Sequence, residues 1–86
     1  MLKITSHPHP DRTVLQLEGA ITGPWIDELR LHLQPKNQPI DLDLAGITYM
    51  DQHATRLIEE SLEKGTKIVA CSHFAALMLQ QNPTEF

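Results

Sequence analysis

Apolar positions along the chain recur at the spacings of short strands and amphipathic helices in turn. The runs at residues 2–5 and 13–18 predict two strands, because β-branched residues and partial alternation are typical of a pleated strand. Residues 6–12 between them contain Pro8 and Pro10, which fix the backbone and remove two donors. This segment is expected to be a stiff connector across which the two strands pair antiparallel.

A first helix is predicted to open at Gly23, which can serve as its N-cap, with Pro24 at the first helical position. Pro35 is expected to end this helix, since proline cannot donate to the preceding turn. The apolar side chains of the predicted helix recur at helical spacing. They are Ile26, Leu29 and Leu33, with Trp25 beside them.

Residues 40–44 alternate apolar and acidic side chains and predict a third strand, followed by a loop over residues 45–50. A second helix is expected to begin near Asp51, whose carboxylate can cap free N–H groups, and to end at Gly65. One face of this helix is apolar and the other is charged. The expected inner face comprises Ala54, Leu57, Ile58, Ser61 and Leu62.

Residues 66–71 predict a fourth strand, and Ser72 is placed to cap a last helix that ends before Asn82 and Pro83. Strands and helices that alternate in this way favour right-handed parallel crossovers. The expected fold class is therefore α/β. A single-layer mixed sheet, with an initial antiparallel hairpin and then parallel strands joined by crossover helices, packs with about three helices. Residues 1–86 are expected to form one domain.

Composition narrows the functional classes. The formal net charge of -4 argues against nucleic-acid binding, which needs a clustered basic face. One cysteine excludes an internal disulfide and fits a reducing compartment. Neither a signal-peptide pattern nor a membrane-length apolar run is present, so a cytoplasmic protein without membrane insertion is expected. The basic residues are scattered: Lys3, Arg12, Arg30, Lys36, Arg56, Lys64 and Lys67.

Three stretches resemble the STAS domains of bacterial anti-sigma-factor antagonists. Residues 17–25, LEGAITGPW, are similar to the family's entry into its first helix. Residues 42–51, LDLAGITYMD, resemble its "DLSGVTFMD" strand and loop, and residues 65–70 resemble the strand that follows. The resemblance spans roughly residues 2–79 and implies the same mixed α/β fold.

The resemblance implies a protein-interaction module that docks against an anti-sigma factor, often a serine kinase, or within a larger signalling or transport assembly. In the family, the kinase phosphorylates the first serine after the aspartate and so breaks the complex. Gln52 stands at that position here, so the usual switch is expected to be absent. The implied contact set combines the loop after the third strand with the following helix: Tyr49, Met50, Asp51, Gln52, His53, Thr55 and Arg56.

The sequence also allows functions other than binding a protein partner. The same loop region could bind a nucleotide, lipid or anion as a sensor domain, with Asp43 and Thr22 as candidate ligand residues. Cys71 could act as a nucleophile, but no acid is evidently placed to orient a neighbouring base. The His7 and His9 pair is too restricted by prolines to predict a metal site. No cofactor and no catalysis are expected.

Apolar side chains near the two later helices favour partner contact as well as core packing. Tyr49 and Leu79 are the candidates for an interface role, because aromatic and flexible apolar side chains are enriched at such surfaces. So small a domain is expected to leave some of this surface exposed, which makes a homodimer plausible.

Overall fold

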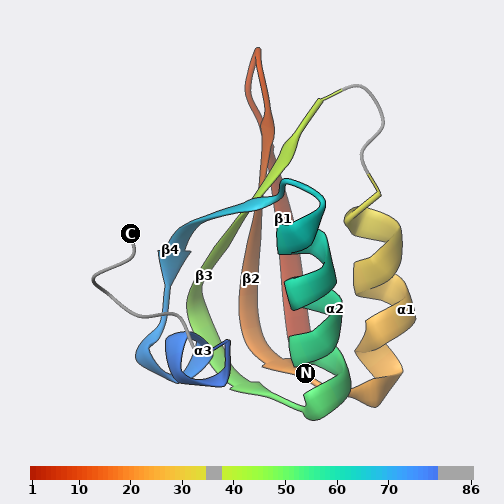
Figure 1. Cartoon of the computed structure of the whole chain (residues 1–86), viewed down its shortest axis with the longest axis vertical. Helices are drawn as coiled ribbons and strands as arrows, with labels where there is room; N and C mark the ends of the chain where they lie inside the picture. Colours follow the sequence, from red (N-terminus) through yellow and green to blue (C-terminus); the bar gives the residue numbers. More distant parts are fainter. Residues whose placement is uncertain (35–37, 80–86) are drawn as a thin grey trace.

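The computed structural model describes residues 1–34 and 38–79. Its four strands form one sheet in the order β1-β2-β3-β4, with β1 antiparallel to β2 and the other neighbouring pairs parallel (Figure 1). The predicted mixed sheet with crossover helices is confirmed. The elements in chain order are β1 (Leu2–Pro8), β2 (Thr13–Ile21), α1 (Gly23–His32), β3 (Ile40–Met50), α2 (Gln52–Glu63), β4 (Lys67–Cys71) and α3 (His73–Met78).

The three helices cover one face of the sheet, and the apolar core lies between them and that face (Figure 1). The opposite face presents polar side chains such as Thr5, Gln16 and Asp43, which are half-buried in the sheet surface. A polar outer face lets one side of the sheet meet water without a second layer of helices. The largest fully buried side chains come from both layers: Leu17, Ile21, Leu29, Leu42, Leu44, Ile47, Met50 and Ile58.

The β1–β2 hairpin is longer than predicted, because β1 continues to Pro8. Proline is tolerated there because β1 is an edge strand. The His9 N–H donates to the Arg12 carbonyl at 2.7 Å and closes the turn. Arg12 Nε lies 3.5 Å from Asp41 Oδ2 on β3, and Asp41 is buried. The ion pair therefore ties the projecting hairpin to the neighbouring strand.

The segment predicted as a loop, residues 45–50, is instead the second half of β3. The β2–β3 register shifts twice, between Gln16 and Glu18 and between Gly19 and Ala20. Each shift places one extra residue in β3, which is the signature of a β-bulge. The inward positions of β3 therefore change spacing from two residues to three. Strict alternation fails there, and this is why the sequence pattern suggested a loop.

The predicted caps of α2 and α3 are confirmed. Asp51 and Ser72 occupy the N-cap positions, and each side chain accepts a hydrogen bond from a backbone N–H three residues later. At the end of α2, Gly65 has a φ of 106°, and the Thr66 N–H donates to the Ser61 carbonyl at 3.0 Å. This pattern satisfies the last carbonyls of the helix.

The N-cap of α1 differs by one residue from the prediction. Thr22, rather than Gly23, is the N-cap residue, and Pro24 lies in the first turn as expected. The helix ends at His32. Pro35 and the Asn82–Pro83 stop lie outside the described residues. Of the helices in the described ranges, none is long and apolar enough to cross a membrane.

Candidate docking surface

The carboxyl ends of the three parallel strands lie at one edge of the sheet, and all three helices begin there (Figure 1). This arrangement follows from the crossover connections, because each strand passes directly into the helix behind it. The turn between β3 and α2, where the sequence placed the contact region, is at the centre of this edge.

Asp51 fixes the geometry of that turn. Its N–H donates to the Ile21 carbonyl at the end of β2, at 3.1 Å. Its Oδ1 accepts from the Ala54 N–H at 2.8 Å, and its own carbonyl accepts from the Thr55 N–H at 3.0 Å. The aspartate is thus a structural cap that holds the start of α2 in one position against the neighbouring strand.

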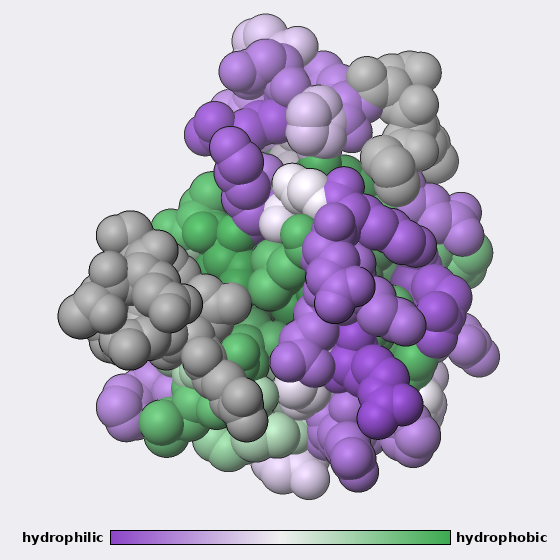
Figure 2. All heavy atoms as spheres, in the orientation of Figure 1, coloured by the Kyte–Doolittle hydropathy of each residue, from purple (hydrophilic) through white to green (hydrophobic). Residues whose placement is uncertain are grey.

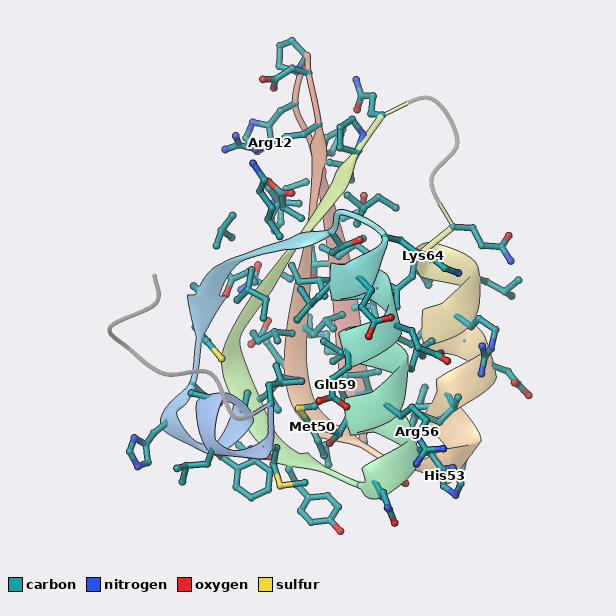
Figure 3. The ribbon with its side chains drawn as sticks, in the orientation of Figure 1. Arg12, Met50, His53, Arg56, Glu59 and Lys64 are labelled. Carbon is teal, nitrogen blue, oxygen red and sulfur yellow. The ribbon has the colours of Figure 1, made fainter. Side chains whose placement is uncertain are left out.

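Four members of the predicted contact set are exposed at this edge: Tyr49, Gln52, His53 and Arg56. We call these four residues the docking surface. Figure 3 shows His53 and Arg56 projecting from the start of α2. Tyr49 is 48% exposed, and its ring centroid lies 5.7 Å from that of Phe74 on α3. An aromatic side chain held by a second ring loses little freedom on binding, which favours its use as a contact.

Two shallow hollows border the docking surface. One, of about 420 Å³, lies between α1 and α2, where Asp27 and Arg30 face His53 and Arg56. The other, of about 430 Å³, lies between α2 and α3 and is lined by Gln52, Arg56 and Met78 among others. The exposed side chains at the start of α2 therefore stand on a ridge with a depression on either side.

The structure corrects two members of the contact set. Met50 is fully buried, because the second bulge of β3 turns this last strand residue into the core. Thr55 is 9% exposed on the inner side of α2, and its hydroxyl donates to the Asp51 carbonyl at 3.0 Å. Leu79, considered for an interface role, is 5% exposed and belongs to the core. Met50 and Leu79 therefore belong to the core, and Thr55 reaches solvent only in the hollow between α2 and α3.

Gln52, the first residue of α2, is exposed at the position where the resemblance places a serine. Two hydroxyl groups near it are engaged in the fold. The Thr55 hydroxyl is buried, and the Ser72 hydroxyl donates to the Ile47 carbonyl at 2.7 Å while accepting from Ala75. Thr48, on the second bulge of β3, is exposed.

The two candidate ligand residues are not brought together. Asp43 lies in the middle of β3 beside Gln16, and its Oδ1 accepts from the Ala45 N–H at 3.0 Å. Thr22 follows the end of β2 and caps α1 without a side-chain hydrogen bond. Gln16 and Ile21, which is next to Thr22, are five positions apart along β2, and at about 3.3 Å per residue this amounts to roughly 16 Å. The geometry does not support a ligand site built on this pair.

The remaining reactive side chains lie apart. Among residues 1–34 and 38–79, no group of three or more His, Cys, Asp or Glu side chains could hold a metal ion together. His7 Nε2 lies 2.8 Å from Gln16 Oε1 on the outer face of the sheet. Burial raises the pKa of the Cys71 thiol above its ordinary value of 9.0, which disfavours the nucleophilic thiolate.

Part of the apolar surface of α3 is exposed, as expected from the sequence. Leu77 is 65% exposed, and Figure 2 shows hydrophobic residues around α3, whereas α2 presents mostly hydrophilic ones. The signal was present in the sequence, since apolar residues lie on more than one face of this short helix. Phe74, on the same helix, lies against the Tyr49 ring at the edge of the docking surface.

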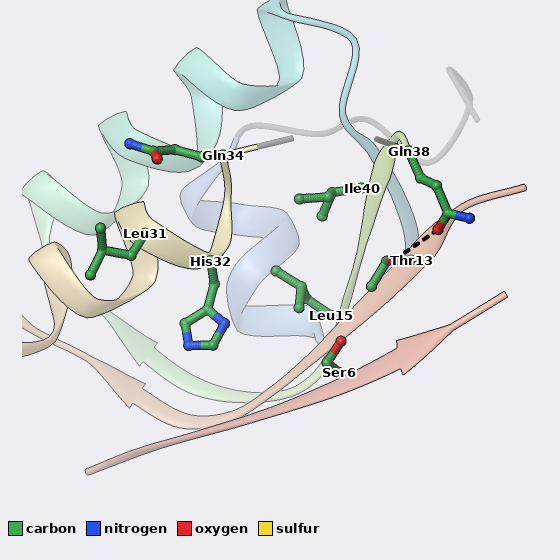
Figure 4. A pocket seen from close by; sticks show the side chains of 8 residues that line it. All are labelled: Ser6, Thr13, Leu15, Leu31, His32, Gln34, Gln38 and Ile40. Atoms are coloured by element: carbon green, nitrogen blue, oxygen red, sulfur yellow. Dashed lines mark hydrogen bonds between the residues drawn. The ribbon is translucent and has the colours of Figure 1, made fainter. Parts of the chain in front are cut away.

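Another hollow lies at the opposite edge of the sheet, where no site was expected. It has a volume of about 490 Å³ and is surrounded by the hairpin, the end of α1 and the start of β3 (Figure 4). Its lining comes from segments far apart in the sequence, so no local motif marks it. The lining residues are Ser6, Thr13, Leu15, Leu31, His32, Gln34, Gln38 and Ile40.

No family model and no curated protein sequence matches this chain. The solved structures that resemble it in fold include an antagonist domain, a second antagonist and one longer protein. The STAS domain of an anti-sigma-factor antagonist from Rhodobacter sphaeroides aligns with a TM-score of 0.63 at 12% identity, over 79% of this chain and 85% of that chain. The anti-sigma factor antagonist SpoIIAA in its unphosphorylated form aligns with a TM-score of 0.67 at 13% identity, over 91% of this chain and 78% of that chain.

The third structure, Mglu, aligns with a TM-score of 0.62 at 22% identity, over 74% of this chain. The aligned region is 18% of Mglu, so there the fold is one part of a much longer chain. At these identities the likeness concerns the arrangement of strands and helices. The resemblance seen in residues 17–25 and 42–51 is thus matched by the backbone, and the chain forms a STAS-like domain.

Proposed function

We propose that this chain is a non-catalytic, cytoplasmic protein-interaction module that binds its partner through the docking surface. The observation that carries the proposal is the exposed start of α2, where Gln52, His53 and Arg56 stand beside the exposed ring of Tyr49. Neighbours of the same fold are named as anti-sigma-factor antagonists, which supports an anti-sigma factor as the partner class. A larger signalling or transport assembly is the other setting for such a module.

The anchored backbone at the start of α2 and the ring contact of Tyr49 support this role. Asp51 joins the start of α2 to β2 through hydrogen bonds, and the Phe74 ring lies against Tyr49. Side chains that are already held in place before binding lose less conformational entropy when a partner arrives. A surface of this kind suits recognition by shape with little rearrangement.

The proposed module remains in one binding state. Phosphorylation of a serine adds about -1.5 to -2 charges at neutral pH, enough to repel a partner. Gln52 has no hydroxyl to accept a phosphate, and the hydroxyl of Thr55 is buried within the same turn. The partner is therefore expected to be released by competition or dilution, and not by modification at the start of α2.

Calorimetric titration against an anti-sigma factor encoded in the same genome tests the docking surface. Tyr49→Ala and Arg56→Glu are each expected to raise the dissociation constant at least tenfold, because aromatic and arginine side chains dominate the binding energy of such interfaces. Lys3→Glu is the matched control, since Lys3 is exposed on the outer strand β1, away from α2. An equal loss of affinity in all three variants would rule out this surface as the binding site. So would unchanged affinity in Tyr49→Ala and Arg56→Glu.

A second experiment tests the absence of a switch. The wild-type chain and Gln52→Ser are incubated with a cognate serine kinase and ATP, and phosphate is located by mass spectrometry. We expect phosphate on the introduced serine alone, and loss of binding only in that variant. Phosphate on Thr48 of the wild-type chain, with release of the partner, would contradict an unswitched module.

A further inference from the structure

The two edge strands of the sheet differ in how well they resist pairing with another chain. β4 has five residues, and its register with β3 shifts between Leu42 and Asp43, so a bulge interrupts its edge. β1 has seven residues, and all of them pair with β2 without a shift. Soluble proteins usually blunt an edge strand with a bulge, a short length, a charge or a proline. Of these features β1 carries only Lys3 and Pro8, so its edge is the more open to pairing.

The backbone of β1 directs alternate residues to its free side. The Ala20 N–H donates to the Met1 carbonyl at 3.0 Å, and bonded and non-bonded pairs alternate from there along an antiparallel ladder. The N–H and C=O groups of Leu2, Ile4 and Ser6 therefore point away from β2. In the part of the chain that the structure describes, no loop, helix or side chain bonds to these groups. They form an unpaired row along the edge.

This row is complementary to a second copy of itself. When two β1 strands run antiparallel with Ile4 opposite Ile4, Leu2 of each copy lies opposite Ser6 of the other, and the outward N–H and C=O groups of all three residues are paired. Ile4 is only partly buried where it packs against the core. In this register each Ile4 side chain covers part of the other, which extends the apolar contact across the edge.

The residues between and beyond the paired ones select this register over its neighbours. It places Lys3 of one copy opposite Thr5 of the other. A register centred on Lys3 would instead bring two like charges directly together, which is unfavourable. A shift toward the hairpin would bring Pro8 into the ladder, and proline has no N–H to donate.

We propose that two copies of this chain associate through their β1 edges, with Ile4 at the two-fold axis, so that their sheets join into one. An isologous contact of this kind needs only one self-complementary surface on each copy. A contact made by one short strand from each copy is at the low end of interface sizes, so the dimer is expected to dissociate on dilution. It uses none of the residues of the docking surface, and either proposal can fail without the other.

Sedimentation of the wild-type chain between about 50 μM and about 1 mM, together with amide hydrogen exchange at both concentrations, tests the proposal. We expect dimer to accumulate with concentration, and the amides of Ile4 and Ser6 to exchange at least twofold more slowly at the higher one, while the amides of β4 are unchanged. A monomer throughout, or a dimer that leaves the Ile4 and Ser6 amides unprotected, would overturn the proposal. So would protection that appears only when a different protein is added.

Two variants of Ser6 test the role of its backbone. Ser6→Pro removes an outward N–H without taking a hydrogen bond from the β1–β2 ladder, whereas Ser6→Ala keeps that N–H. Ser6→Pro is expected to raise the dissociation constant of the dimer at least tenfold, and Ser6→Ala to change it less than twofold. Circular dichroism checks that both variants fold. Equal dissociation constants in the two folded variants would refute pairing at this edge.

A charge pair at Thr5 tests the register and does not depend on proline. Thr5→Lys places a cation opposite Lys3 of the second copy, and Thr5→Glu places an anion there. The dissociation constant of the dimer is expected to rise at least fivefold in Thr5→Lys and to fall at least twofold in Thr5→Glu, because like charges repel and opposite charges attract across a strand pair. Damage to the fold would weaken the dimer in both variants. Changes in the same direction, or none in either, would therefore contradict this register.

Discussion

Asp51 connects three elements through a single residue. Its backbone N–H reaches the carbonyl of Ile21 on β2, its side chain caps α2, and its position continues β3. Capping side chains of this kind satisfy an N–H group that no helix carbonyl can reach. The same residue thus determines where the docking surface stands relative to the sheet.

Replacement of Asp51 by alanine is expected to lower the free energy of unfolding by about 1 kcal/mol, because the Ala54 N–H loses its acceptor. Asp51→Asn keeps an acceptor oxygen and is expected to retain most of that stability. Urea denaturation followed by circular dichroism measures both values. An asparagine variant as unstable as the alanine variant would show that the cap is not the source of the effect.

Cys71 provides a prediction on pH. Burial raises the pKa of its thiol in the folded chain above the ordinary value of 9.0, so the folded state holds this proton more tightly than the unfolded state does. The resulting stability is fully present below the unfolded pKa and is lost as pH rises through the folded pKa.

Urea denaturation between about pH 8 and about pH 11 tests the Cys71 prediction. The free energy of unfolding of wild type relative to Cys71→Ala is expected to fall across this range. Taking the difference from the alanine variant removes the contribution of tyrosine and lysine ionisation at high pH, which is the same in both proteins. A constant difference would contradict the raised pKa.

At the scale of elements, the ends of the later helices could be predicted because they depend on local chemistry. The extent of β3 could not be predicted, because it depends on pairing with another strand. Asp51, Ser72 and Gly65 mark boundaries because their own side chains or backbone preferences act within a few residues. The second half of β3 was missed because its bulges depend on pairing with β2. The resemblance had placed Met50 in the contact loop, whereas the observed register buries it.

Gly65 is required by the backbone at the end of α2, and its substitution tests that element. With a φ of 106° and no atom within 4 Å of an added Cβ, Gly65→Ala adds strain without a clash. The expected cost is about 1 kcal/mol of unfolding free energy. Gly23, in open space and without a positive φ, is the matched control.

The control variant Gly23→Ala is expected to leave stability unchanged or to raise it by up to about 1 kcal/mol, since alanine restricts the unfolded chain. Thermal or urea unfolding of the two variants separates backbone strain from the general effect of adding a methyl group. Equal changes in both variants would mean that the conformation of Gly65 is not the cause.

At the scale of the whole molecule, the helices cover one face of the sheet and all begin at its carboxyl edge. The two edges of the sheet therefore carry different kinds of surface. The carboxyl edge gathers three helix starts and exposed polar side chains, while the amino edge encloses the hollow beside the hairpin. The sequence predicted the first, because strand and helix order already determines it. It could not predict the second, since Ser6, Leu31 and Ile40 come from different elements and meet only after folding.

The same one-sidedness predicts opposite outcomes for neighbouring residues of β2. Leu17 is fully buried beneath the helices, whereas Gln16 lies on the outer face with its side chain bonded to His7. Leu17→Ala is expected to cost about 2–5 kcal/mol, because it leaves a cavity in the core. Gln16→Ala is expected to stay within about 0.5 kcal/mol, as is usual for surface positions.

The expected loss of stability in Leu17→Ala is large relative to the total stability of so small a domain. At about 0.05–0.15 kcal/mol per residue, a chain of 86 residues has roughly 4–13 kcal/mol of stability in total. Leu17→Ala would then remove a large share of it, visible as a lower urea midpoint with an unchanged slope. If Gln16→Ala proved as costly as Leu17→Ala, the outer face would be buried in solution, and something would cover the sheet on that side.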